Sequence, residues 1–313
     1  MLHILQRFLL TCGRHGRMIL ILGLLGGILL PEPAIFLQKY LPVLVVLLLF
    51  VAALRIGPRN LISNKETFRT EILILLLFQV ALPLCVWVAF QLFGFTGPLA
   101  LALLLVCSAS SIGGSPNLVI LSGKNPAPAM RMLMTGTAIL PFTVIPIFLL
   151  IPELGSPFAV ALAAGRLLLY VALALSIAFA IRWFLLVEPS DETLGAIDGV
   201  SALLMAVLVV GLMTAVGPAL RTVPMEVLKV LAIACVDNFG LQTIFWLVFH
   251  RGEFAEARVS YAVVSGNRNM ALFLSSLPFA IMEPLLLFIG CYQIPMYLTP
   301  IVMGWLYRRN KSE

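Results

Sequence analysis

Long apolar runs recur from one end of the chain to the other, and they constrain the fold more than any other feature. A membrane-spanning helix needs about 20 mostly apolar residues. Charged residues make up only 11% of the 313 residues, and the mean hydropathy is +1.09. Because a soluble domain carries about a quarter charged residues, this chain has too little polar surface for a water-soluble fold. We therefore predict an all-α polytopic protein in a lipid bilayer, with residues 1–313 forming one membrane domain.

Charged or proline- and glycine-containing segments divide the apolar runs into ten predicted spans. The spans cover residues 17–37, 40–57, 70–93, 97–122, 128–151, 159–186, 197–217, 224–249, 256–277 and 281–306. The connecting loops are short, so no extra soluble domain and no soluble partner is expected.

The distribution of Lys and Arg predicts the orientation, since cytoplasmic loops carry an excess of both. With the N-terminus inside, 15 of the 20 basic residues fall in cytoplasmic segments and three in outer loops, while Arg166 and Arg268 lie within spans. This predicts a multi-pass protein of the cell membrane with both termini in the cytoplasm. The net charge of +6 then reflects topology and gives no indication of nucleic-acid binding.

Sequence signatures of enzymes, metal sites and nucleotide-binding sites were not found. The five cysteines are far apart, without a CxxC pair, and are interpreted as small buried residues. The chain shows no GxSxG, P-loop, HExxH or dinucleotide fingerprint. We therefore predict no catalytic residue, no cofactor and no metal site, and an intramembrane enzyme or a receptor is the weaker alternative.

Two predicted spans contain polar, helix-weakening sequence at membrane depth. The fourth span holds CSASSIGGSPN at 107–117, where Gly113 and Gly114 permit non-helical dihedrals and Pro116 removes a backbone donor. The ninth holds VSGNRNM at 264–270. Irregular backbone at this depth survives only inside protein or beside a water-filled cavity. Ordinary helix kinks are the alternative for each motif alone.

Both breaks fall in the fourth span of a group of five. This predicts two inverted repeats, about 17–151 and 159–306, whose discontinuous helices 4 and 9 cross near the midplane, as in many secondary transporters. The predicted substrate- or ion-binding residues are Ser111, Gly113, Gly114, Ser115, Pro116, Asn117, Asp237, Asn238, Ser265, Gly266, Asn267, Arg268 and Asn269.

These motifs resemble the bile acid/sodium symporter family, within the wider bile/arsenite/riboflavin transporter superfamily. SIGGSPNLV at 111–119 and GKN at 123–125 are similar to the family's first crossover. DNFGL at 237–241 resembles its His-Asn-x-Gly-Leu motif, and ARVSYA at 257–262 with SGNRNMAL at 265–272 resembles the second crossover. The order and spacing match over nearly the whole chain, which indicates a divergent member.

The resemblance implies a panel domain of spans 1, 2, 6 and 7 and a core of spans 3–5 and 8–10. It implies that substrate binds in the cleft between panel and core, beside the crossing, and that access alternates as the two move. Family substrates are organic anions, usually carried with sodium.

The departures from the family pattern put sodium in doubt. Val264 stands where the family has a glutamate, Arg268 where it has a glutamine, and Pro116 where it has a hydroxyl. Hard cations prefer several oxygen ligands, so sodium is possible but most of its expected ligands are missing. Asn117 and Asn269 are retained, and we expect them to hold the crossing together.

We interpret three ionisable residues as intramembrane, where a charge costs at least ~2.5–3.5 kcal/mol. Arg166 is near a span end and is expected to extend to the interface. Asp237 and Arg268 are either a structural pair, or a proton-carrying carboxylate and an anion-binding guanidinium. Ser110, Gln79 and Gln242 could line the same cavity. We predict a secondary transporter of a small organic anion, with an efflux carrier for an oxyanion or another metabolite as the alternative.

Overall fold

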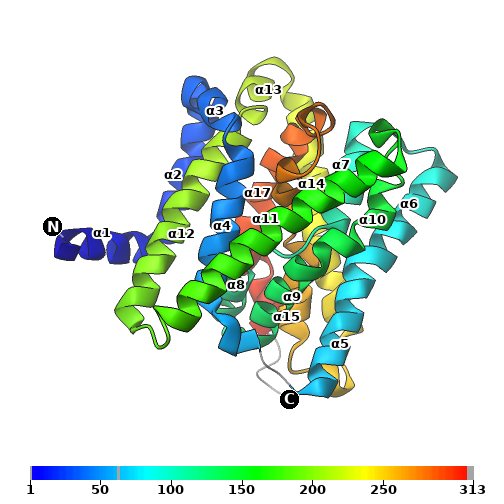
Figure 1. Cartoon of the computed structure of the whole chain (residues 1–313). Coiled ribbons are helices and arrows are strands. Elements are labelled where there is room, and N and C mark those ends of the chain that lie inside the picture. The colour runs from blue at the N-terminus through cyan, green and yellow to red at the C-terminus, as the bar shows by residue number, and fades with distance from the viewer. Residues whose placement is uncertain (1, 62–63, 309–313) are drawn as a thin grey trace. The chain divides into compact units, whose positions relative to one another are not determined.

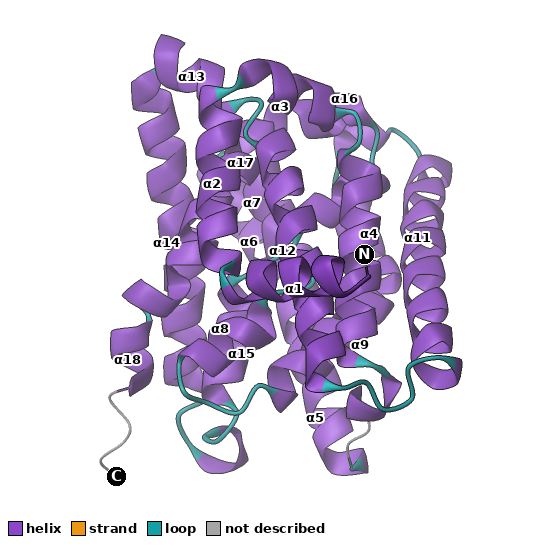
Figure 2. Cartoon of the chain, turned by 90° about the vertical axis from the view of Figure 1, so that its left-hand side faces the viewer, coloured by secondary structure: helices purple, strands orange, loops and turns teal. Residues whose placement is uncertain are grey.

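The apolar runs form helices throughout the computed structural model, which describes residues 2–61 and 64–308 (Figure 1). Within these ranges the structure contains no strand, and short turns join the helices (Figure 2). Five helices are long and apolar enough to cross a membrane, or up to seven if each of two bent pairs is one span. The all-helical membrane fold is therefore confirmed, whereas the ten-span arrangement stays a prediction.

Four of the expected spans are divided into shorter pieces, which is one reason why fewer long helices are present. The span 17–37 is divided at Leu30. The other three comprise α7 (Pro98–Ser108) with α8 (Ser115–Leu121), α9 (Ala127–Thr143) with α10 (Ile145–Phe148), and α15 (Arg258–Gly266) with a 3₁₀ segment (Met270–Ser275). Two of these four divisions are the helix breaks that the sequence predicts.

The chain divides into two compact units, of which the first comprises residues 1–59, 166–227 and 271–290. Its helices are α1 (Leu2–Arg14), α2 (Gly16–Leu29), α3 (Pro31–Gln38), α4 (Leu41–Ile56), most of α11 (Pro157–Phe184), α12 (Asp191–Leu212) and α13 (Val216–Thr222). The long helix α12 is central, because α1, α2, α3 and α4 all pack against it. Glycines allow this close packing: a Cβ at Gly27 would lie 2.9 Å from the carbonyl oxygen of Val210.

The second unit comprises residues 60–165, 228–270 and 291–313. Besides α7–α10 and α15, it holds α5 (Lys65–Leu76), a π-helical turn (Leu77–Ala81), α6 (Leu82–Phe93), most of α14 (Pro224–Val248), most of α17 (Leu286–Val302) and α18 (Gly304–Arg308). Buried polar side chains are concentrated in this unit, which contains both helix breaks.

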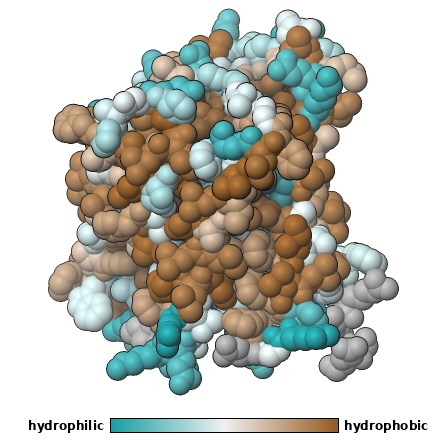
Figure 3. Space-filling view, turned by 90° about the vertical axis from the view of Figure 1, so that its right-hand side faces the viewer, coloured by the Kyte–Doolittle hydropathy of each residue, from teal (hydrophilic) through white to brown (hydrophobic). Residues whose placement is uncertain are grey.

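Large apolar side chains also cover much of the outside of the molecule. Figure 3 shows a face on which apolar residues predominate and hydrophilic residues gather toward the edges. Leu92 and Phe93 at the end of α6 are 78% and 86% exposed. Such continuous apolar surface is unfavourable in water and fits contact with lipid chains.

Candidate functional site

The two helix breaks lie against each other in the second unit and pair through their backbones. Ser111 and Arg268 form an isolated antiparallel bridge. The Ile112 N–H donates to the Asn267 carbonyl at 2.9 Å, and the Asn269 N–H donates to the Ser110 carbonyl at 2.7 Å. We call residues 109–114 and 267–269 the crossover. Its pairing satisfies backbone groups that a broken helix would otherwise leave exposed to a low-dielectric interior.

The first break begins where α7 ends at Ser108 and Ala109 turns to an extended conformation, with ψ 156°. Pro116 lies in the first turn of α8, where its missing N–H leaves no hydrogen bond unmade. Neither Gly113 nor Gly114 has a positive φ, so the break does not use the left-handed conformations that glycine permits.

The second break follows Gly266, the last residue of α15. A Cβ at Gly266 would lie 2.2 Å from the Asn238 carbonyl oxygen on α14, so only glycine fits at this position. The Gly266 carbonyl accepts hydrogen bonds from the Asn238 amide and from the Tyr292 hydroxyl. Close backbone approach and side-chain donors together fix the end of α15 on α14.

Arg268 is the central charge of the crossover, with a side chain that is 1% exposed. Its Nε donates to the Ser265 carbonyl at 2.7 Å, and its Nη1 donates to the Ala109 carbonyl at 2.9 Å. Ser265 is in the last turn of α15 and Ala109 follows the last turn of α7, so the guanidinium lies at the carbonyl ends of two helices. The guanidinium carbon also lies 5.0 Å from the ring centroid of Phe78.

Helix C-termini carry partial negative charge, and they favour a cation. A guanidinium there compensates both helix ends at once and joins the two breaks. The Nη2 nitrogen of Arg268 is buried and has no hydrogen-bond partner. One donor of a permanent cation is therefore free for an acceptor at this site.

A chain of amides and hydroxyls extends from the second break. The Asn267 carboxamide oxygen accepts from Thr299 at 3.1 Å and from Asn238 at 3.4 Å. Gln242 donates to the Asn238 side-chain oxygen at 2.7 Å and accepts from Tyr307 at 2.7 Å. Asn238 and Gln242 lie on α14, Thr299 lies on α17, and Asn267 lies in the second break. The network therefore fixes the positions of these three segments relative to one another. Thr299, Tyr292 and Tyr307 were not predicted from sequence.

Asp237 lies beside the crossover on α14, yet it forms no ion pair with Arg268 among the described residues. The predicted structural pair is therefore wrong as a direct contact. The Asp237 Oδ1 accepts from the Cys107 thiol at 3.7 Å, and Oδ2 is buried without a hydrogen-bond partner. Cys107, interpreted from sequence as an ordinary buried residue, is thus the contact of this carboxylate on α7.

The expectation that Asn117 and Asn269 hold the crossing was wrong for both side chains. Asn117 lies on α8 and is exposed. Asn269 takes part through its backbone N–H, and within the described residues its carboxamide makes no hydrogen bond. Asn267 has the role expected of them, because its side chain reaches back to the Val263 carbonyl at 2.9 Å and sideways to Thr299.

Hydroxyl groups support the first break from two sides. Ser111 and Ser115 are hydrogen-bonded to each other, and Ser111 donates to the Asn267 carbonyl at 3.3 Å. On the other side, Thr137 of α9 donates to the Ser110 hydroxyl at 3.2 Å. Gln79 instead donates to the Gly136 carbonyl at 2.9 Å, which ties the π-helical turn to α9.

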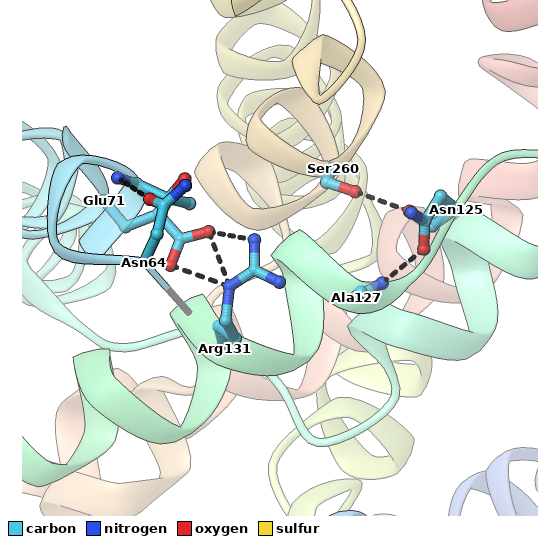
Figure 4. A network of polar contacts seen from close by, with 7 residues as sticks. Asn64, Glu71, Asn125, Ala127, Arg131 and Ser260 are labelled. Carbon is cyan, nitrogen blue, oxygen red and sulfur yellow. Dashed lines mark hydrogen bonds and ion pairs between the residues drawn. The ribbon is translucent and has the colours of Figure 1, made fainter. Parts of the chain in front are cut away.

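A second polar group lies at another end of the same unit, around a cavity of about 350 Å³. Glu71 of α5 is 2% exposed and accepts three hydrogen bonds from Arg131 of α9, the shortest at 2.6 Å (Figure 4). Beside this pair, the Asn125 side chain accepts from the Ala127 N–H, and the Asn125 carbonyl accepts from Ser260 of α15. These contacts join α5, α9 and α15, and the residues that make them are not among the predicted site residues.

No protein-family model matches the sequence, and no curated protein matches it in a sequence comparison. The residues described here contain no group of three or more His, Cys, Asp or Glu side chains that could hold a metal ion.

Proposed function

We propose that this chain is a secondary transporter of a small organic anion, working by alternating access, in which Arg268 supplies the positive charge at the crossover. The observation that carries the proposal is the position of the guanidinium at the carbonyl ends of α7 and α15, with one donor nitrogen free. Discontinuous transporter helices bind ions at such ends. A buried arginine stays protonated in proteins, so this charge cannot dissociate during a transport cycle.

The division of the chain supports the same proposal. Residues 1–59 and 166–227 belong to the first unit, and they include the predicted spans 1, 2 and 7 and most of span 6. The second unit contains most of the other predicted spans and both helix breaks. This division is similar to the panel and core that the family resemblance implies, except that residues 159–165 and 271–290 are assigned differently. Transport by inverted repeats, and the anionic substrate, are parts of the proposal.

The missing ligands argue for sodium-independent transport. The crossover presents a guanidinium, amides and hydroxyls, while the carboxylate that the family uses for sodium is replaced by Val264. The driving force then comes from the substrate gradient, from exchange, or from a proton carried by Asp237. The Oδ2 atom of Asp237, which is buried and accepts no hydrogen bond, supports a proton-carrying role.

The test is uptake and efflux of labelled carboxylates in proteoliposomes, with sodium, potassium or choline outside and with or without a proton gradient. We expect uptake that is equal in the three salts. Sodium-dependent uptake would contradict the proposal that the Arg268 charge replaces a bound sodium ion, but it would still agree with the proposal that the chain is a transporter. Absence of carboxylate movement in every gradient would contradict the transport proposal, and faster efflux than uptake would identify an efflux carrier.

Arg268→Gln separates the role of the charge from that of the fold. The variant should lose sodium-independent uptake, and gain of sodium-dependent uptake would directly support replacement of an ion by the guanidinium. Arg166→Gln is the matched control, because Arg166 is exposed on α11. Equal uptake by the Arg268 variant and this control would remove the guanidinium from the mechanism.

A further inference from the structure

The N-terminal helix α1 (Leu2–Arg14) differs from the spans, because it is amphipathic and turns sharply from the helix that follows it. The axis of residues 5–14 makes an angle of 83° with the axis of Met18–Leu29 in α2. α2 then runs along the span α12, since a Cβ at Gly23 would lie 2.8 Å from the Ala206 carbonyl oxygen. A helix perpendicular to packed spans lies along the membrane plane.

The contacts of α1 give its level along α12. A Cβ at Gly13 would lie 2.8 Å from the Gly195 carbonyl oxygen, and one at Gly199 would meet the Leu9 carbonyl. Gly195 and Gly199 follow Asp191, the first residue of α12, by four and eight positions, which is about 6–12 Å at 1.5 Å per residue. The start of α12 is polar, with Ser190, Asp191 and Glu192. The helix α1 therefore crosses α12 within about 12 Å of the first residue of α12, and Figure 2 shows α1 running across the direction of the packed helices.

The side of α1 away from α12 is divided into an apolar edge and a basic edge. Leu5 and Phe8, three residues apart on one edge, are 55% and 54% exposed. Arg7 and Arg14, seven residues apart on another edge, are both exposed and about 10 Å apart along the axis. Exposed Leu and Phe at this level are unfavourable in water, and they fit the boundary between headgroups and acyl chains.

The charges near α1 leave its two arginines available. Glu192 accepts from Gln6 at 3.1 Å, and Asp198 is paired with Arg55 at 2.8 Å. Within the described residues neither Arg7 nor Arg14 forms an ion pair. Asp191, in the first turn of α12, is the other carboxylate at this end of the helix. Two unpaired guanidinium groups beside an apolar edge match the anionic headgroups of a leaflet.

We infer that α1 is an in-plane interfacial helix, in which Leu5 and Phe8 enter the acyl boundary and Arg7 and Arg14 bind anionic lipid headgroups. The occupant of this surface is the lipid layer itself. The inference depends on the chain being a membrane protein and is independent of what the chain transports.

The depth of α1 can be measured on the full-length protein in vesicles. The Phe8→Trp variant is compared with Leu22→Trp, whose position on α2 is 65% exposed, and the fluorescence of the unsubstituted protein is subtracted. Lipids carry bromine either near the headgroup end of the acyl chain or near its terminal methyl. We expect the added indole of Phe8→Trp to be quenched most by the shallow bromine, and that of Leu22→Trp most by the deep one.

Two results would overturn the inferred position. Quenching of the added indole in Phe8→Trp by aqueous iodide and by neither lipid would place α1 in water, free for a protein partner. Strongest quenching of both variants by the deep bromine would place α1 in the hydrocarbon core.

The lipid preference is tested with brominated phosphatidylglycerol against brominated phosphatidylcholine, each diluted in the same unlabelled bilayer. Phosphatidylglycerol should quench Phe8→Trp several-fold more efficiently, and adding Arg7→Gln with Arg14→Gln should bring the ratio close to one. Arg221→Gln on α13 is the control and should leave the ratio unchanged. An unchanged ratio after both arginines are replaced would overturn the role of Arg7 and Arg14.

Discussion

The Nη1 nitrogen of Arg268 lies 2.9 Å from the carbonyl oxygen of Ala109, although 159 positions separate the two residues in the sequence. This hydrogen bond joins Ala109, which follows the last residue of α7 at the first break, to Arg268, which lies in the second break after α15. It replaces a water or ion that the carbonyl would otherwise need at this depth. The stability of the second unit should therefore depend on a few contacts at the crossover.

Gly266→Ala is expected to be among the most damaging single substitutions in the chain. Its Cβ would lie 2.2 Å from the Asn238 carbonyl oxygen, which is backbone and cannot rotate away. We expect loss of folded protein in detergent, measured by size-exclusion chromatography and thermal unfolding. The control is Gly240→Ala on α14, where a Cβ meets nothing within 4 Å; this change should stabilise by about 0.5–1 kcal/mol through helix propensity. Equal behaviour of both variants would contradict the close approach.

Asn267→Leu should destabilise the protein far more than Asn117→Leu. The first change removes the acceptor that Thr299 and Asn238 share, and each buried hydrogen bond lost costs about 0.5–1.5 kcal/mol. Asn117 is exposed, so its replacement should change stability by less than about 0.5 kcal/mol. Thermal unfolding of the two variants in one detergent gives the comparison. A larger loss at Asn117 would show that the network is centred elsewhere.

The pair of Glu71 and Arg131 should behave as one unit. Glu71→Met leaves the Arg131 charge without its carboxylate, and removing one partner of a buried pair costs about 3–5 kcal/mol. Arg131→Met leaves the Glu71 carboxylate buried and unpaired. The double variant Glu71→Met with Arg131→Met should be more stable than either single variant, as measured by a double-mutant cycle of unfolding free energies. Additive losses would show that the two charges act independently.

The loop between α8 and α9 should face the cytoplasm. The prediction comes from the excess of Lys and Arg in the segments on this side. In a cysteine-free background, Lys124→Cys should resist a membrane-impermeant thiol reagent in intact cells, and Arg221→Cys should react. The reverse labelling pattern would invert the topology.

The positions of both helix breaks could be predicted from sequence, because proline, glycine and consecutive polar residues disfavour a helix locally. The contacts inside the breaks could not be predicted. Asn117, Asn267 and Asn269 are equally polar in sequence, and only the fold decides that Asn267 faces Thr299 while Asn117 is exposed. Tyr292 and Cys107 could not be assigned from sequence, since nothing in the sequence indicates that they contact Gly266 and Asp237.

Hydropathy alone could not predict which of the expected spans are continuous helices, for a related reason. An apolar run indicates that a segment is buried or lies in lipid, but it does not indicate whether the backbone is helical along its whole length. The segment 128–151 is mostly apolar, yet α9 ends at Thr143 and a separate short helix follows. Pro141 lies inside α9 without ending it, whereas Pro146 lies in the first turn of α10. The sequence alone therefore could not predict which of the two prolines accompanies the break.

The backbone pairing between the breaks also has a consequence for synthesis of the chain. Ser111 is translated 156 residues before Asn267, its acceptor across the crossover, which at 5–20 residues per second is a delay of roughly 8–30 s. During that interval the amides of the first break have no partner within the nascent chain. The insertion machinery must shelter this segment, or hold it as a temporary continuous helix, until the ribosome delivers the complementary half.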